Sequence, residues 1–113
     1  MAVSFSGINE NYVTFKVNGE VNSGDLVTMH SNDTVKACAN GDSIVGVARS
    51  VRNGYASVQI TGVVTIKYVT NAPGLGIRPM EAHASDEAVI SQTGRRLLVV
   101  SQDQANGVFT AIL

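Results

Sequence analysis

Two histidines and one cysteine are the side chains of this sequence best suited to metal binding or covalent catalysis. His30, Asp33 and Cys38 lie near one another in the sequence, but no pair of them has the spacing of a zinc site. His83 is far away along the chain. Nucleophilic catalysis needs a serine or cysteine beside an oriented base, and the G-x-S-x-G pattern of a nucleophile elbow is absent. We therefore predict no metal site, and we expect Cys38 to be a small strand residue.

Acidic pairs and glycine-rich loops give no stronger signal for chemistry. Asp86 and Glu87 are adjacent, so on a strand they would point to opposite faces and could not act as an acid–base pair. Gly74-Leu75-Gly76 has the first two glycines of a dinucleotide fingerprint, but Pro79 stands where the third belongs. The sequence thus predicts a protein that is not an enzyme and that binds no cofactor.

Composition narrows the class of partner. The chain has 113 residues, with 8 basic and 9 acidic side chains. Because there is no basic excess, we predict no nucleic-acid partner, and because no 18-residue apolar run exists, we predict no membrane partner. A single cysteine cannot form an intramolecular disulfide, and the first residues lack the features of a signal peptide. We expect a protein made and used in a reducing cytosol, or in a particle assembled there.

The elements that must position these side chains are predicted to be strands. Val, Ile and Thr together supply 32 residues. Four Asn-Gly pairs, which favour tight turns, lie beside β-prone sequence at 18–19, 40–41, 53–54 and 106–107. Alternating or apolar runs predict strands over 12–17, 26–30, 34–38, 44–49, 55–60, 63–69, 96–102 and 108–113. This pattern favours an all-β fold, a small β-barrel formed as a single domain over residues 12–113.

Three segments fit this pattern less well. Residues 1–11 have no firm period, and we interpret them as an extended N-terminal arm. Residues 72–76 form a predicted loop. Residues 85–89 could begin a short helix with Ser85 as its cap, or could equally form a strand. No internal repeat, low-complexity tract or domain linker is visible.

The last two predicted strands are apolar on both faces, in Leu97–Val100 and Val108–Leu113. Such a strand needs two covers, and a neighbouring copy of the chain can supply the second. The alternative is that one chain covers both faces. We predict an oligomer, with an interface that includes Leu97, Val99, Phe109, Ile112 and Leu113.

Two parts of the sequence carry motifs that occur together in one class of protein. The first is a turn, Ser23-Gly24-Asp25-Leu26-Val27, followed by the strand motifs Gly46-Val47-Ala48 and Val58-Gln59-Ile60-Thr61-Gly62. The second is the apolar hairpin from Gly94 to Leu113. Together they resemble the small head decoration proteins of tailed phages and the related structural proteins encoded by prophages.

The resemblance implies a β-clip-like barrel and a non-enzymatic homotrimer whose partner is the major capsid protein lattice. Such a protein would decorate and stabilise the capsid at the virion surface, after assembly in the host bacterial cytoplasm. We expect the arm to reach the capsid through Val3, Phe5 and Ile8, because an extended arm can add a strand to a sheet edge. The same turn motif also occurs in β-clip domains attached to sugar-acid enzymes. The alternative function is therefore an accessory domain that binds a small ligand.

Overall fold

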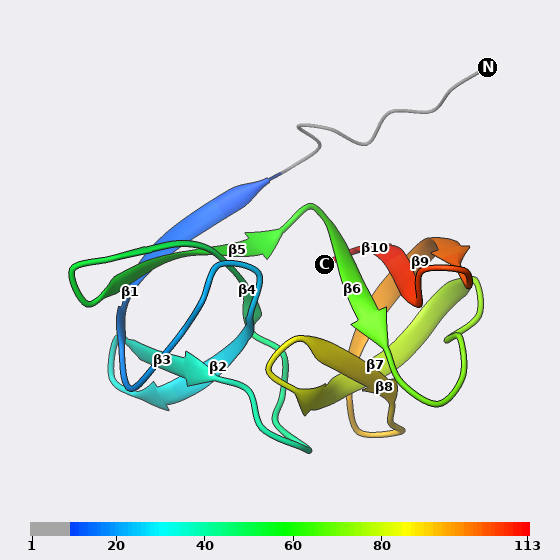
Figure 1. Cartoon of the computed structure of the whole chain (residues 1–113), viewed down its shortest axis with the longest axis horizontal. Coiled ribbons are helices and arrows are strands. Elements are labelled where there is room, and N and C mark those ends of the chain that lie inside the picture. Colours follow the sequence, from blue (N-terminus) through cyan, green and yellow to red (C-terminus); the bar gives the residue numbers. More distant parts are fainter. Residues whose placement is uncertain (1–9) are drawn as a thin grey trace.

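The computed structural model describes residues 10–113, and these residues form strands joined by turns and loops (Figure 1). The strands form two closed barrels of five strands each, which we call barrel 1 and barrel 2. The predicted all-β barrel fold is confirmed, with two barrels where one was expected. Barrel 1 contains β1 (Asn11–Val17), β2 (Leu26–Ser31), β3 (Thr34–Ala37), β4 (Gly46–Arg52) and β5 (Tyr55–Thr61). Barrel 2 contains β6 (Val63–Tyr68), β7 (Gly76–Ala84), β8 (Glu87–Ile90), β9 (Arg95–Asp103) and β10 (Val108–Ile112).

The two barrels have the same topology. The strand order is β1-β3-β2-β4-β5 in barrel 1 and β6-β8-β7-β9-β10 in barrel 2. In each barrel the first strand pairs in parallel with the third and antiparallel with the fifth, which closes the barrel. A bulge interrupts the last hairpin at the same place, at Arg49 in β4 and at Val100 in β9. The chain is therefore a tandem structural repeat, which the sequence analysis did not detect.

The pairing registers show which residues are equivalent in the two barrels. Lys16 lies opposite Tyr55 in barrel 1, and Lys67 lies opposite Val108 in barrel 2. Val13-Thr14-Phe15-Lys16 of β1 thus matches Val64-Thr65-Ile66-Lys67 of β6. His30 and His83 both occupy the bulge of the second strand, and Asp33 and Asp86 both lie in the turn that follows.

The turns explain how the strands are joined. Asn53-Gly54 is a two-residue hairpin turn with both residues at positive φ, as a type I′ turn requires. Asn32-Asp33 makes the turn between β2 and β3. Asn106-Gly107 ends the longer loop between β9 and β10. Asn18-Gly19 and Asn40-Gly41 lead out of strands instead of joining a hairpin.

Strands β7 and β8 were not among the eight expected strands. Residues 87–90 form a strand, so the helical interpretation of 85–89 is wrong, because Ser85-Asp86 makes a two-residue turn between β7 and β8. β7 contains Pro79, which masked the strand pattern. Of the arm, residues 1–9 with Val3, Phe5 and Ile8 lie outside the described residues, and β1 begins at Asn11.

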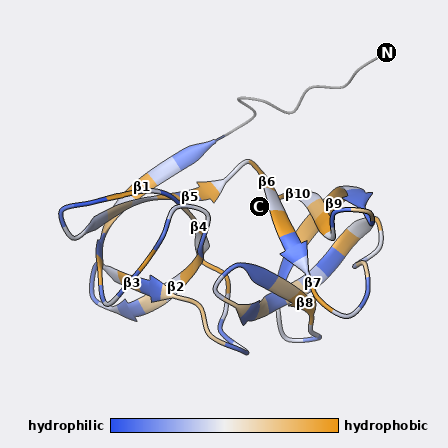
Figure 2. Cartoon of the chain, in the orientation of Figure 1, coloured by the Kyte–Doolittle hydropathy of each residue, from blue (hydrophilic) through white to orange (hydrophobic). Residues whose placement is uncertain are grey.

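Each barrel has a hydrophobic interior, visible as the orange segments of the strands in Figure 2. The buried residues inside barrel 1 are small: Val21, Val27, Val35, Ala48, Ala56 and Val58. The second cluster contains the interior of barrel 2: Val64, Ile66, Met80, Ala82, Ala88, Leu97, Val99, Phe109 and Ala111. This second cluster also includes four residues from barrel 1, Leu26, Cys38, Ile44 and Val47. The cores are therefore unequal, and barrel 1 contributes to both.

Gly46 marks a point where two strands meet closely. A Cβ added there would overlap the backbone carbonyl of Gln59 and would stand 2.7 Å from the Val58 side chain. We predict that Gly46→Ala lowers the free energy of unfolding by about 3 kcal/mol, because the β4–β5 pairing must open to admit the methyl group. Gly19→Ala is the control. A Cβ there meets no atom within 4 Å, and only its φ of 77° opposes the change, at about 1 kcal/mol. Urea denaturation of both variants tests this, and equal losses would contradict it.

Candidate functional site

The contact between the barrels, which we call the junction, is the most elaborate feature of the described surface. Leu26 and Val47 are direct partners on β2 and β4, and they are only 1% and 3% exposed. Their sequence neighbours Val27 and Ala48 point into barrel 1, so Leu26 and Val47 lie on its outer face. They belong instead to the cluster that fills barrel 2. The outer face of barrel 1 thus closes the core of barrel 2.

Backbone hydrogen bonds fix this contact. The amide of Leu26 donates to the carbonyl of Ser85, in the β7–β8 turn, at 2.6 Å. The amide of Gly41 donates to Ala82 at 2.9 Å, and the amide of Ala82 donates to Asp42 at 3.0 Å. The loop between β3 and β4 therefore pairs with β7 much as a strand would, and it fixes the relative position of the barrels.

Arg95 joins the barrels through its side chain. Its guanidinium donates to the carbonyls of Ile44 at 3.2 Å, Val45 at 2.7 Å and Ile60 at 3.2 Å, all in barrel 1. Burial lowers the pKa of Arg95, but a guanidinium keeps its charge at neutral pH. Charge-assisted bonds to three carbonyls from separate segments make Arg95 a clamp across the junction.

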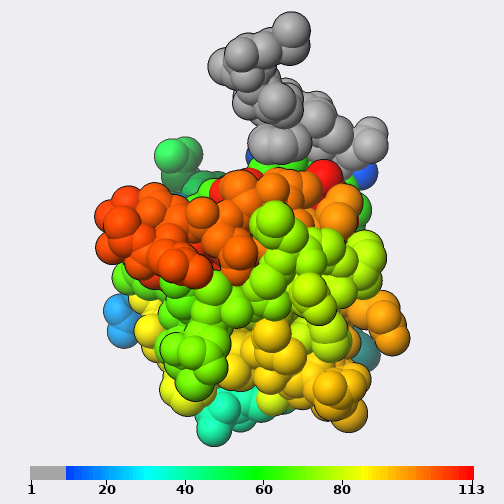
Figure 3. All heavy atoms as spheres, turned by 90° about the vertical axis from the view of Figure 1, so that its right-hand side faces the viewer, coloured from blue at the N-terminus to red at the C-terminus, as the bar shows by residue number. Residues whose placement is uncertain are grey.

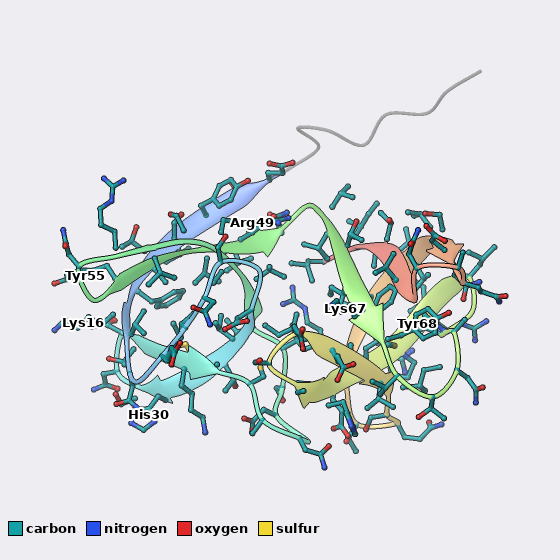
Figure 4. All side chains as sticks on the ribbon, in the orientation of Figure 1. Lys16, His30, Arg49, Tyr55, Lys67 and Tyr68 are labelled. Carbon is teal, nitrogen blue, oxygen red and sulfur yellow. The ribbon has the colours of Figure 1, made fainter. Side chains whose placement is uncertain are left out.

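A second polar network holds the segment between β5 and β6. Gln59 is fully buried, and its amide nitrogen donates to the carbonyls of Thr61 at 3.0 Å and Val63 at 3.1 Å. Its oxygen accepts a 2.7 Å bond from Nε of Arg49, which lies on β4 close to β5 (Figure 4). The side chain therefore satisfies the backbone at the crossing from one barrel to the other.

A cleft of about 310 Å³ lies beside the junction. Barrel 1 lines it with the Ser23-Gly24-Asp25 turn and Leu26, and barrel 2 lines it with Thr65, Ile66, Lys67, Asp86 and Val108. Its polar groups have partners within the protein. Asp25 accepts from the amide of Asn22 at 2.9 Å, and Lys67 pairs with Asp86 at 3.4 Å. The cleft is large enough for a small ligand but presents its charges already paired.

The candidate residues for chemistry do not converge. His30 and His83 are exposed at equivalent points of different barrels, and Asp33 lies in the β2–β3 turn. Cys38 is buried in the junction, where its thiol faces the carbonyl of Ser43 at 3.8 Å. Among residues 10–113, no three His, Cys, Asp or Glu side chains lie close enough together to hold a metal ion. The same residues include no helix long and apolar enough to cross a membrane.

The residues predicted for an oligomer interface divide into two groups. Leu97, Val99 and Phe109 are buried inside barrel 2, so one chain already covers them. Ile112 and Leu113 are only partly buried. The second cover of these strands is needed by the side chains that alternate with the interior ones, and the oligomer stays a prediction that rests on those outward side chains.

Those outward side chains form an apolar row across four strands of barrel 2. Ile77 on β7 is directly opposite Leu98 on β9, which is opposite Ile112 on β10, which is opposite Val63 on β6. Ile77 is 56% exposed and Leu98 is 38% exposed. Figure 3 views the free end of barrel 2, where yellow-green β7 and orange β9 lie side by side. We call this set the outer row, and sequence reasoning missed it because β7 was not expected.

No protein-family model matches the chain, and no curated protein matches its sequence. The class of protein is therefore defined by the fold alone, as a tandem of two five-stranded barrels with a built junction.

Arg95→Ala tests the clamp. We expect a loss of about 2–3 kcal/mol in the free energy of unfolding, because three junction carbonyls lose a charged donor. Arg78→Ala is the matched control, since Arg78 is exposed and donates to a single carbonyl, that of Leu75. Chemical denaturation measures both. If the two variants lose the same stability, Arg95 is not a clamp.

The Cys38 thiol gives a pH-dependent test of the junction. Burial, aided by the nearby Asp42 carboxylate, raises the pKa of Cys38 from 9.0 to about 12. The unfolded chain therefore releases this proton first, and the free energy of unfolding falls as pH rises from about 9 towards 12. We predict that this fall is steeper in the native protein than in Cys38→Ala, measured by denaturation across that range. Parallel pH profiles would show that the thiol is not shielded.

Proposed function

We propose that the chain is a non-enzymatic structural protein of a phage or prophage particle, which decorates and stabilises the capsid as a homo-oligomer. The observation that carries this proposal is the outer row of barrel 2, an apolar stripe over four paired strands that one chain leaves uncovered. Exposed apolar stripes of this kind are typical of surfaces that bind other proteins.

The motifs behind the resemblance support the same proposal, because all of them build the fold. Asp25 accepts from the amide of Asn22 and so shapes the turn before β2. Gly46 admits the close approach of β5, and Gln59 holds the crossing between barrels. Residues used in this way specify a rigid building block instead of a catalytic centre.

A decoration protein stabilises a shell by mass action, since it binds the closed lattice and not the opened one. A homotrimer would match a local threefold axis of the lattice and would make three weak contacts act as one strong contact. The proposed capsid contact is the N-terminal arm with Val3, Phe5 and Ile8, which precedes β1.

The second candidate, an accessory domain for a small ligand, would use the cleft beside the junction. That site has suitable volume, but Lys67 and Asp86 pair with each other, and the Ser23 hydroxyl donates to the carbonyl of Arg49 at 2.8 Å. Because these polar groups have partners within the chain, we favour the structural function.

Co-sedimentation with expanded, empty heads of the phage or prophage that encodes the chain tests the proposed function. We expect the protein to pellet with the heads, to saturate at a fixed number of copies per capsid subunit, and to raise the temperature at which the heads open. Deletion of residues 2–10 is expected to abolish pelleting, with the circular dichroism spectrum of the barrels unchanged.

Unexpanded procapsids are the control particle. Protein that stays in the supernatant with expanded heads would sink the capsid proposal. Pelleting that survives deletion of residues 2–10 would show that another surface makes the contact.

A further inference from the structure

We infer that copies of this chain associate head to tail, with the outer row of barrel 2 seated on the free end of barrel 1 of the next copy. The inference rests on the self-association in the proposed function, but not on the capsid. Its basis is the repeat, because one chain already contains this contact once, at its own junction.

The junction joins two different surfaces of one repeated unit. Barrel 1 contributes the outer face of β2 and β4, with Leu26 and Val47. Barrel 2 contributes its β7–β8 turn and the neighbouring end of its core, with Ser85 and Ala82. We call the first surface the donor face and the second the acceptor end. A contact between unlike surfaces of identical folds is heterologous, and it leaves one surface of each kind unused at the ends.

The unused donor face belongs to barrel 2. Val47 and Leu98 are equivalent, because each lies one residue before the last regular pair ahead of the bulge in its hairpin. Their partners on the second strand are Leu26 and Ile77. Leu26 and Val47 are 1% and 3% exposed, whereas Ile77 and Leu98 are 56% and 38% exposed. The same apolar pair is thus covered in barrel 1 and open in barrel 2.

The unused acceptor end belongs to barrel 1. Met29 of barrel 1 is equivalent to Ala82 of barrel 2, through their pairing with Val35 and Ala88. Ala82 is fully buried under the junction, whereas Met29 is 43% exposed. Tyr55, equivalent to Val108, is 50% exposed. In Figure 4, Tyr55 with Lys16 and His30 lies at the end of barrel 1 away from barrel 2.

The direction of the hairpins agrees with a head-to-tail arrangement. In Figure 1 the β7–β8 turn points towards barrel 1, and the equivalent β2–β3 turn points away from barrel 2 at the opposite end. Charge is also complementary, since Arg96 flanks Leu98 on the outer face of β9 and Asp33 lies in the β2–β3 turn. Chains joined in this way close into a ring, and three copies would make a ring of six barrels.

Cross-linking of two single-cysteine variants tests the contact. By equivalence with the Leu26–Ser85 bond, Ile77 of one copy lies beside Asn32 of the next. We expect a short bismaleimide to give a covalent dimer from a mixture of Asn32→Cys and Ile77→Cys, and none from either variant alone. Ser101→Cys, exposed further along β9, replaces Ile77→Cys in the control mixture. Cys38 is buried, and the unsubstituted protein reports any contribution from its thiol.

Sedimentation equilibrium provides the second readout. We expect the native protein to sediment as a closed oligomer, Leu98→Lys as a monomer with an unchanged circular dichroism spectrum, and Ser101→Lys as the native oligomer. A native monomer, or a mixture that cross-links no better than its controls, would overturn the inference. An oligomer that survives Leu98→Lys would overturn this interface and leave self-association standing. Cross-linking without head binding would preserve the interface and remove the capsid function.

Discussion

The burial of the outer face of barrel 1 under barrel 2 is the constraint on which the rest of the structure depends. A barrel of five short strands encloses little volume, and the interior of barrel 1 is filled almost entirely by valine and alanine. Barrel 2 holds the larger side chains, including Phe109 and Met80, but its core is complete only when Leu26 and Val47 close it. Each barrel therefore depends on the other, and the junction acts as the main core of the chain.

The polar side chains near the junction follow from this burial. Closing one barrel with the outside of another brings carbonyls of loops and strand ends out of water, and each must find a donor. Arg95 supplies one guanidinium to three carbonyls, and Gln59 supplies the crossing to β6. No buried side-chain polar atom among the described residues lacks a partner. The chemistry of these residues is thus spent on architecture, in agreement with a structural function.

Local patterns predicted the strands well but not their number or arrangement. The eight expected strands all exist, because alternation and Asn-Gly turns are local signals. β7 was missed because Pro79 and exposed Ile77 break the expected pattern, and without β7 neither the second barrel nor the outer row could be derived. Arg95 and Gln59 look like ordinary strand residues, since their role depends on contacts with residues 35 and 51 positions away or on a chain crossing. The repeat leaves a trace in Val13–Lys16 and Val64–Lys67, which is too short to stand out before the registers are known.

The position of a barrel in the tandem, and not its sequence, decides whether its donor face is covered. Leu26 with Val47 and Ile77 with Leu98 are both aliphatic pairs on the second and fourth strands of the same fold. A strand that is apolar on both sides therefore indicates that a cover exists, but it does not say whether the cover belongs to the same chain. In any head-to-tail array the internal faces are buried by neighbours and the terminal faces are not, so terminal units usually carry a polar cap. Barrel 2 has no such cap on Ile77 and Leu98, which is the pattern expected of a unit whose array continues into another copy.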